Sequence, residues 1–249
     1  MRILAVDTAT TVSSVAFLEN GQLSAEATFP PNDSNGVTVS GKSNHSETVL
    51  PLIQSVLDRA HRRFSDVDAI AVSIGPGSFT GLRIGLALVK GLAYDCNLPV
   101  VGVSSLEAQA LRVSELPDTV CPLIDARKQE VYAALFKKLG GKLERCAADQ
   151  AIGISELINL FGATPDTTPI AFVGNGAERY REHILHLFDG RAQLIGDACG
   201  CSAAGAVARI ALERLAVGSG TELRQLAPLY LGASQALGNN LKIVSNQLN

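Results

Sequence analysis

The chain has 249 residues, of which 47% are hydrophobic and 18% charged, a balance typical of well-packed globular domains. Its formal net charge of −3 argues against a protein that grips nucleic acid with one broad basic surface, so any RNA is expected mainly on another subunit. Five cysteines without a C-x-x-C pair and four histidines without metal-ligand spacing indicate neither a metal site nor a disulfide framework.

The start of the chain predicts a cytoplasmic protein without a membrane partner. Asp7 comes too early for a signal peptide, and no apolar run approaches the length of a membrane span.

The first 29 residues predict a three-stranded antiparallel meander. Ile3–Val6 is a continuous apolar strand that ends at Asp7 and a small polar turn. Val12–Leu18 and Leu23–Phe29 give two further strands, and Asn20-Gly21 between them is typical of a two-residue hairpin. The meander therefore places an acid at the exit of its first strand.

A polar loop and a helix follow the meander. Pro30–Asn44 is rich in proline, asparagine, serine and glycine, which predicts a mobile loop. His45-Ser-Glu-Thr48 leads into a helix whose apolar residues recur with the helical period from Val49 to Ala60, so Pro51 is expected in its first turn, where proline is tolerated.

A glycine-rich stretch then predicts a strand, a turn and a helix. Gly75-Pro-Gly77 ends a buried strand, and Ser78 or Thr80 caps the helix. Gly81 and Gly85 lie one turn apart and expose bare backbone, either toward a phosphate or a partner helix, or only for tight packing of the helix on the sheet. The spacing matches neither G-x-x-x-x-G-K-[ST] nor G-x-G-x-x-G, so a standard phosphate loop is not supported.

The second half repeats the order of the first. Asp7 precedes Gly21 by 14 positions, and Asp125 precedes Gly141 by 16, each within a pattern of strand, acid, strand, glycine turn and strand. We interpret this as an internal duplication. The other predicted elements are strands at Leu98–Val103 and Ile170–Val173, helices at Ser105–Val113, Ser155–Phe161, Glu178–Phe188 and Ser202–Leu215, and an extended docking segment at Ala227–Leu231.

The duplication predicts two domains, residues 1–106 and 107–231, with the last helix either in the second domain or packed back on the first. Residues 232–249 have no periodicity and predict a poorly ordered tail.

Two units that each open with a meander and an acid resemble the superfamily of actin, sugar kinases and heat-shock chaperone ATPases. The resemblance implies an α/β, duplicated actin-like (ribonuclease H-like) fold with mixed sheets flanked by helices. It also implies a cleft in which Asp7, Thr8 and Asp125 hold Mg²⁺ and ATP, with Gly174 and Gly176 as a nucleotide loop. The alternative is that the acids and the threonine are turn and capping residues. Bulky cations after Asp125 predict a cleft weakened for catalysis.

Four motifs together resemble the bacterial TsaB (YeaZ) family over nearly all of residues 1–231. They are Ile3-Leu-Ala-Val-Asp-Thr-Ala-Thr, His45-Ser-Glu, Gly75-Pro-Gly-Ser-Phe-Thr-Gly-Leu-Arg-Ile-Gly, and Asp125-Ala-Arg-Lys-Gln-Glu-Val-Tyr. The resemblance implies a non-catalytic subunit that activates the catalytic paralogue TsaD in synthesis of N6-threonylcarbamoyladenosine, the modified adenosine beside the anticodon of ANN-decoding tRNAs. It further implies that the ATPase TsaE and the tRNA join through the complex.

The same resemblance implies that catalytic residues and resident cofactors are absent from this chain. TsaD carries a metal-binding His-x-x-x-His, and Ser105 and Gln109 stand at those two positions here. The alternative function is an ATP-dependent phosphotransferase or ATPase that uses Asp7 and Asp125. A protease is disfavoured because no nucleophile–base or metal constellation is present, and Ser78 reads as a cap.

In the family, paralogues pair through the two N-terminal-domain helices, here within Ser46–Leu57 and Thr80–Leu92. The glycine-lined face at Gly81 and Gly85 would let a partner helix approach closely, and the chain alone is expected to form a homodimer. The predicted interface residues are His45, Ser46, Val49, Leu50, Ile53, Leu57, Thr80, Gly81, Arg83, Ile84, Gly85 and Leu88.

Overall fold

The computed structural model describes residues 1–29, 45–112, 117–140, 142–161, 168–196 and 202–232. The predicted loop at Pro30–Asn44 and the predicted tail from residue 233 lie outside the described residues. The chain divides into two compact units, one of Met1–Ser114 with Cys199–Leu229, the other of Glu115–Ala198 with Tyr230–Asn249. No helix among the described residues is long and apolar enough to cross a membrane.

The first unit is built on a five-stranded mixed sheet. Its strands are β1 (Arg2–Asp7), β2 (Ser13–Glu19), β3 (Gln22–Phe29), β4 (Ala69–Gly75) and β5 (Val100–Ser104), in the order β3-β2-β1-β4-β5. The first three form the predicted antiparallel meander, and β4 and β5 run parallel to β1. Asn20 and Gly21 both have positive φ, as the predicted hairpin requires.

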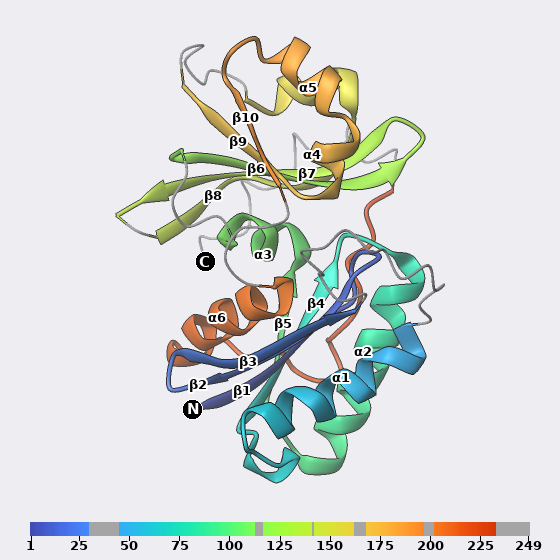
Figure 1. Ribbon diagram of the computed structural model, residues 1–249, viewed down its shortest axis with the longest axis vertical. Helices are drawn as coiled ribbons and strands as arrows, with labels where there is room; N and C mark the ends of the chain where they lie inside the picture. Colours follow the sequence, from blue (N-terminus) through green and yellow to red (C-terminus); the bar gives the residue numbers. More distant parts are fainter. Residues whose placement is uncertain (30–44, 113–116, 141, 162–167, 197–201, 233–249) are drawn as a thin grey trace, which may run out of the picture. The chain divides into compact units, whose positions relative to one another are not determined.

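Helices cover both faces of the first sheet (Figure 1). One face packs against α1 (His45–Arg59) and α2 (Phe79–Cys96), the other against α3 (Ser105–Leu111) and α6 (Ala203–Ala216), and a short 3-10 turn, η1 (Phe64–Asp66), links α1 to β4. The expectation for Pro51 was wrong. Because α1 already begins at His45, Pro51 lies in its second turn, where its ring is exposed.

The first unit also contains the last helix and the segment after it, so the predicted boundary at residues 106 and 107 needs correction. Small residues of α6 pack between β-strand side chains, which assigns this helix to the first sheet. Beyond it Thr221 bridges to Val100 at the edge of β5, Leu226 is buried, and the Leu229 N–H donates to the Ile74 carbonyl oxygen at 2.7 Å. Residues 203–229 therefore complete the first core.

The second unit repeats the topology of the first. Its sheet has the order β8-β7-β6-β9-β10, with β6, β7 and β8 antiparallel and β9 and β10 parallel to β6. The strands are β6 (Thr119–Arg127), β7 (Glu130–Leu139), β8 (Lys142–Gly153), β9 (Ile170–Val173) and β10 (Ala192–Ile195); the helices are η2 (Ile154–Phe161), α4 (Asn175–Arg179) and α5 (Arg181–Leu187). The same strand order and directions confirm the predicted fold class.

Three local predictions for the second unit differ from the structure. The helix expected over Glu178–Phe188 is two short helices, α4 and α5, and the helix expected over Ser155–Phe161 is the 3-10 element η2. The four-residue strand β10 was not predicted, because Ala-Gln-Leu-Ile is too short to show a period.

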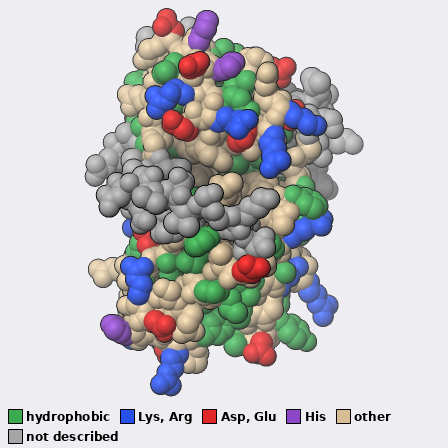
Figure 2. All heavy atoms as spheres, turned by 45° about the vertical axis from the view of Figure 1, so that its right-hand side comes forward, with side chains coloured by type: hydrophobic (Ala, Val, Ile, Leu, Met, Phe, Trp, Pro, Cys, Tyr) green, Lys and Arg blue, Asp and Glu red, His purple; other side chains and the backbone are tan. Residues whose placement is uncertain are grey.

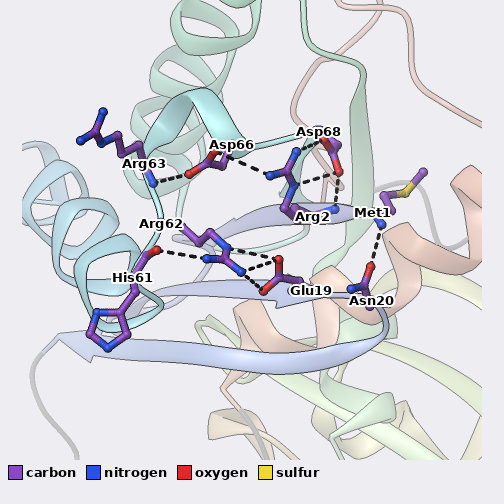
Figure 3. Close-up of polar contacts among 9 residues, drawn as sticks. All are labelled: Met1, Arg2, Glu19, Asn20, His61, Arg62, Arg63, Asp66 and Asp68. Atoms are coloured by element: carbon purple, nitrogen blue, oxygen red, sulfur yellow. Dashed lines mark hydrogen bonds and ion pairs between the residues drawn. The ribbon is translucent and has the colours of Figure 1, made fainter.

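Ion pairs and hydrogen bonds tie together the amino-terminal end of β1, the β2–β3 hairpin and the connection from α1 to β4 (Figure 3). Arg2 pairs with Asp68 at 2.9 Å between Nη2 and Oδ1, and Arg62 pairs with Glu19 at 3.0 Å between Nη2 and Oε1. These contacts are remote from the carboxyl ends of β1, β4 and β5, where the predicted site residues lie.

Candidate functional site

The acidic turn of the first unit is buried. Asp7 and Thr8 follow β1, and Asp7 lies beside Ser73 because Val6 pairs with Val72 in the parallel register of β1 and β4. Burial raises the pKa of the Asp7 carboxyl, while the Ser73 hydroxyl, the Ala9 amide and the charge of Arg112 oppose that rise. A buried carboxyl with a raised pKa favours its protonated form.

Thr8 and the Gly81–Gly85 stretch of α2 are in direct contact. The Thr8 Oγ1 donates a hydrogen bond to the Gly81 carbonyl oxygen at 2.8 Å, and a Cβ added to Gly85 would overlap Thr8 Oγ1. Ser78 is the cap of α2, since its Oγ accepts from the Gly81 N–H at 3.2 Å, and its own N–H donates to the Ala9 carbonyl oxygen at 2.7 Å.

The glycines of α2 therefore pack the helix on its own unit, and their predicted role as a partner-docking face was wrong. Three further predicted interface residues, Val49, Ile53 and Leu57, are buried in the core of the first unit and cannot also contact a partner. The side chain of His45 lies outside the described residues. Ser46, Leu50, Thr80 and Arg83 are exposed, and Ile84 and Leu88 are partly exposed.

The exposed side of α2, hereafter the α2 face, is apolar and lies opposite the buried Gly81 and Gly85. Thr80, Ile84, Ala87, Gly91 and Tyr94 follow one another at intervals of four and three residues, which places them on one stripe. Tyr94 is 82% exposed, and a Cβ on Gly91 would meet nothing within 4 Å. The pattern of exposed positions indicates a helix that presents small residues between larger ones.

Two large side chains extend the apolar surface around this stripe. Phe79 is 53% exposed with the Arg83 guanidinium 3.8 Å from its ring centroid, and Leu50 on the neighbouring helix α1 is 54% exposed. Hydrophobic side chains gather in the middle of the first unit's surface in the space-filling view (Figure 2). Sequence reasoning missed the exposed Phe79, Ala87 and Tyr94. The apolar period through Leu82 and Leu86 could have found them, because it marks the buried side of α2 and leaves the opposite side for a partner.

Ser105 and Gln109, the positions at which the resemblance implies the metal-binding histidines of TsaD, both lie on α3. Ser105 is buried, and its Oγ has no hydrogen-bond partner among the described residues. Gln109 is buried too, and its Oε1 accepts from Arg112 Nη1 at 2.9 Å. The described parts of the chain contain no group of three His, Cys, Asp or Glu side chains that could hold a metal ion.

The acidic turn of the second unit is bound by its own neighbours. Asp125 Oδ1 accepts from the Arg127 N–H at 2.9 Å and from the Tyr180 hydroxyl at 3.3 Å, and its Oδ2 lies 3.5 Å from Arg179 Nε. The Asp125 N–H donates to Asn175 Oδ1 at 3.1 Å. This carboxylate is thus committed to holding the turn and α4 together.

The predicted nucleotide loop is closely packed on β6. Gly174 has φ +95°, and a Cβ there would lie 2.5 Å from the Leu123 carbonyl oxygen; a Cβ on Gly176 would lie 2.9 Å from the Leu123 carbonyl carbon. These glycines let the five-residue helix α4, which follows β9, pack closely against β6. They do not fit an open phosphate cradle. That Asp7 and Asp125 face each other across a cleft stays a prediction.

Comparison with known proteins gives a consistent set of relatives. The family model described as "TsaD: tRNA N6-adenosine threonylcarbamoyltransferase" matches residues 38–242. The "tRNA threonylcarbamoyladenosine biosynthesis protein TsaB" of Bacillus subtilis is 31% identical over 184 residues, which cover 74% of this chain and 75% of that protein. The TsaB protein of Escherichia coli is 38% identical over 140 residues, or 55% of this chain and 56% of that protein, so this match spans about half of its length.

A solved structure extends the similarity to the whole fold. YeaZ from Pseudomonas aeruginosa superposes with a TM-score of 0.74 and 29% identity, and the match covers 92% of this chain and 99% of that one.

Proposed function

Because the chain belongs to the TsaB family, we propose that it is a non-catalytic subunit in tRNA threonylcarbamoyladenosine biosynthesis that pairs with and activates TsaD. In this proposal TsaD transfers threonylcarbamoyl to the adenosine beside the anticodon of ANN-decoding tRNAs. The ATPase TsaE joins through the complex, ATP and Mg²⁺ act in the partners, and tRNA is held mainly by the assembly.

The observation that supports the pairing is the exposed α2 face, together with the exposed Leu50 on α1. Leu50, Phe79 and Tyr94 leave large apolar side chains in water, and exposed apolar side chains on neighbouring helices favour a protein interaction site. The small residues Ala87 and Gly91 between them let the backbone of a partner helix come close. In the absence of TsaD, two copies of the chain would pair through the same face, since a surface that binds a paralogue also suits a two-fold dimer.

The alternative, an ATP-dependent phosphotransferase or ATPase, requires carboxylates that are available to Mg²⁺ or water. Asp7 is buried at the end of β1 with a raised pKa, and Asp125 is bound by Arg179, Tyr180 and the Arg127 N–H. No observation on the described residues favours this alternative. It would be favoured by single-turnover ATP cleavage by the purified chain that disappears in Asp7→Asn.

Ala87→Arg tests the pairing without disturbing the core. The side chain is exposed and arginine is a good helix former, so the variant should fold like the wild type while placing a charge in the centre of the α2 face. We expect the affinity for TsaD to fall by at least about 100-fold, because an unpaired charge would be buried at the interface. Isothermal titration calorimetry and co-purification measure the effect.

The matched control is Glu213→Arg, an equally exposed position on α6, on the opposite side of the first sheet. It should leave the affinity for TsaD unchanged. Undiminished pairing by Ala87→Arg would refute the assigned face, and full-rate tRNA modification by the complex without this chain would refute the scaffold role. A large residue at Gly85 does not test the pairing, because it would overlap Thr8 within the fold.

A further inference from the structure

The turn between β6 and β7 has an unusual backbone for its residues. Arg127, Lys128 and Gln129 all have positive φ, at 66°, 50° and 63°. Arg127 pairs with Glu130 across the strands, so Lys128 and Gln129 form a two-residue hairpin loop in the conformation for which Asn-Gly is preferred. Three consecutive left-handed residues other than glycine cost free energy, which is why such runs point to a function.

The other hairpin with the same conformation shows what the ordinary solution is. Asn20 and Gly21, between β2 and β3, have φ values of 52° and 82°, a conformation that asparagine tolerates and that glycine adopts freely because it lacks a Cβ. The β6–β7 turn adopts it with two long cations and a glutamine instead. The chain thus carries long cationic side chains at a turn for which the smaller, uncharged Asn-Gly pair is preferred.

The charges of this turn face outward. Arg127 and Lys128 are exposed, and neither side chain has an ion-pair partner in the described ranges of the chain. Arg179 lies beside them through its contact with Asp125, and 61% of its side chain remains exposed. The turn thus carries two exposed cations, and a third, Arg179, is paired with the carboxylate of Asp125, which also accepts from the Arg127 N–H.

We propose that Arg127 and Lys128, with Arg179 behind them, bind the sugar–phosphate backbone of tRNA in the assembled complex. This inference rests on the proposed function and names the tRNA contact that this chain contributes. Guanidinium and ammonium groups on a fixed turn bind phosphodiesters by charge and hydrogen bonds, without reading the bases. With a net charge of −3, the chain needs such a local cluster if it contacts RNA at all.

A free nucleotide is the other source of phosphate for the same cations. The geometry favours RNA, because Gly174 and Gly176 pack directly against Leu123. They therefore leave no cradle in which a triphosphate could be enclosed. A polyanion that approaches from outside needs only the exposed cations.

The test separates charge from folding by installing the preferred turn residues. Arg127→Gly, Lys128→Asn and Gln129→Gly together remove both cations and place Asn-Gly in the loop, so the variant should unfold at no lower temperature than the wild type. Gln129→Gly alone is the matched control, because it relieves strain and keeps both cations. Lys142→Asn with Arg209→Gln removes two exposed cations elsewhere.

The measurement is the affinity of the complex with TsaD for an unmodified transcript of an ANN-decoding tRNA, as a function of salt concentration. The triple variant should bind about tenfold more weakly or worse, and the slope of log affinity against log salt should become shallower by about 2. Both controls should bind like the wild type.

Wild-type affinity and salt slope in the triple variant would overturn this inference, and TsaD pairing would show that the proposed function survives. ATP or inorganic pyrophosphate that binds the wild type and not the triple variant, with tRNA affinity unchanged, would assign the turn to a nucleotide and also overturn it. Full modification without this chain would remove the proposed function, and this inference with it.

Discussion

The two units carry an acid at the same topological position and use it in different ways. Asp7 ends β1 and is buried beside Ser73, whereas Asp125 is near the end of β6, where Arg179 and Tyr180 contact its carboxylate. The strand order and directions around the two acids are the same. The duplication therefore preserves the backbone scaffold and not the chemistry at its strand ends.

The lengths of the flanking elements explain the difference. In the first unit a five-residue connection, Thr8–Val12, links β1 to β2, and an 18-residue helix, α2, closes on it through glycines. In the second unit the connection is a two-residue hairpin loop, and the helix after β9 is the five-residue α4. The first unit gains a rigid platform beneath an exposed helix face, and the second gains a turn that faces solvent.

The largest expected effect concerns the packed glycine of the second unit. Gly174→Ala should lower the free energy of unfolding by about 3 kcal/mol, because the new Cβ meets the Leu123 carbonyl oxygen and φ is +95°. Denaturant unfolding measures this change. Gly190→Ala is the control for φ alone, since Gly190 has φ +68° and open space around it, and it should cost only about 1 kcal/mol.

An unchanged stability of Gly174→Ala would mean that the loop can open away from β6. The glycine would then fit a nucleotide loop again, and the contrast between the two units would weaken.

The next effect concerns the corresponding contact in the first unit. Gly85→Ala should cost about 2 kcal/mol, because Thr8 must turn away and lose its buried hydrogen bond to the Gly81 carbonyl oxygen. In a Thr8→Ala background the same substitution should cost at least about 1 kcal/mol less, since the clashing Oγ1 is gone. Chemical denaturation of the four proteins in this cycle gives the coupling.

Gly91→Ala is the control on the same helix. A Cβ there meets nothing within 4 Å, so alanine should raise the free energy of unfolding by up to about 1 kcal/mol through its better helix propensity. Additive effects of Thr8→Ala and Gly85→Ala would contradict the direct contact and reopen the docking role of the glycines.

A smaller effect is expected at the acid of the second unit. Asp125→Ala removes the acceptor for the Arg127 N–H and the Tyr180 hydroxyl and the partner of Arg179, and should cost about 1 to 2 kcal/mol. Asp125→Asn keeps an acceptor and should cost less. Thermal unfolding compares them. No loss in the alanine variant would mean that these contacts do not organise the turn.

The sequence predicts the scaffold well because its signals are local. Asn20-Gly21 and the apolar strands on either side of it determine the meander, and the repeat around Asp125 predicts the second sheet. Prediction from the sequence failed where one residue pattern is compatible with two packing arrangements. Gly81 and Gly85 allow close approach of any backbone, and only the fold shows that Thr8 fills that place.

The remaining failures have equally specific causes. The sequence places Pro51 in the first turn because the apolar period begins only at Val49. The exposed Ser46 and Glu47 before it already belong to α1. The left-handed backbone of Lys128 and Gln129 follows from the pairing of β6 with β7. The sequence does not indicate it, because lysine and glutamine usually avoid this conformation. The identity of the side chains alone therefore could not show that Asp7 is buried and the turn after Asp125 is exposed.

The pH dependence of stability supplies the most delicate comparison. The folded-state pKa of Asp7 is raised above the ordinary 3.8 by burial, so the folded chain keeps this proton where the unfolded chain loses it. The stability that Asp7 contributes is full below pH 3.8 and is lost as the pH rises through the folded pKa. Asp7→Asn cannot ionise, so its stability relative to the wild type should increase as the pH rises from 3.8 through the folded pKa of Asp7, as urea titrations at a series of pH values would show.

Asp68→Asn provides the reference of opposite sign. Its hydrogen bond with Arg2 lowers the pKa of Asp68, so the contribution of this carboxylate is present above pH 3.8 and is lost as the pH falls through the folded pKa. This variant should be less stable than the wild type at neutral pH, and the difference should vanish in acid. If Asp7→Asn followed the same course as Asp68→Asn, Asp7 would be ionised in the fold, and a cation-binding role for the first acidic turn would return.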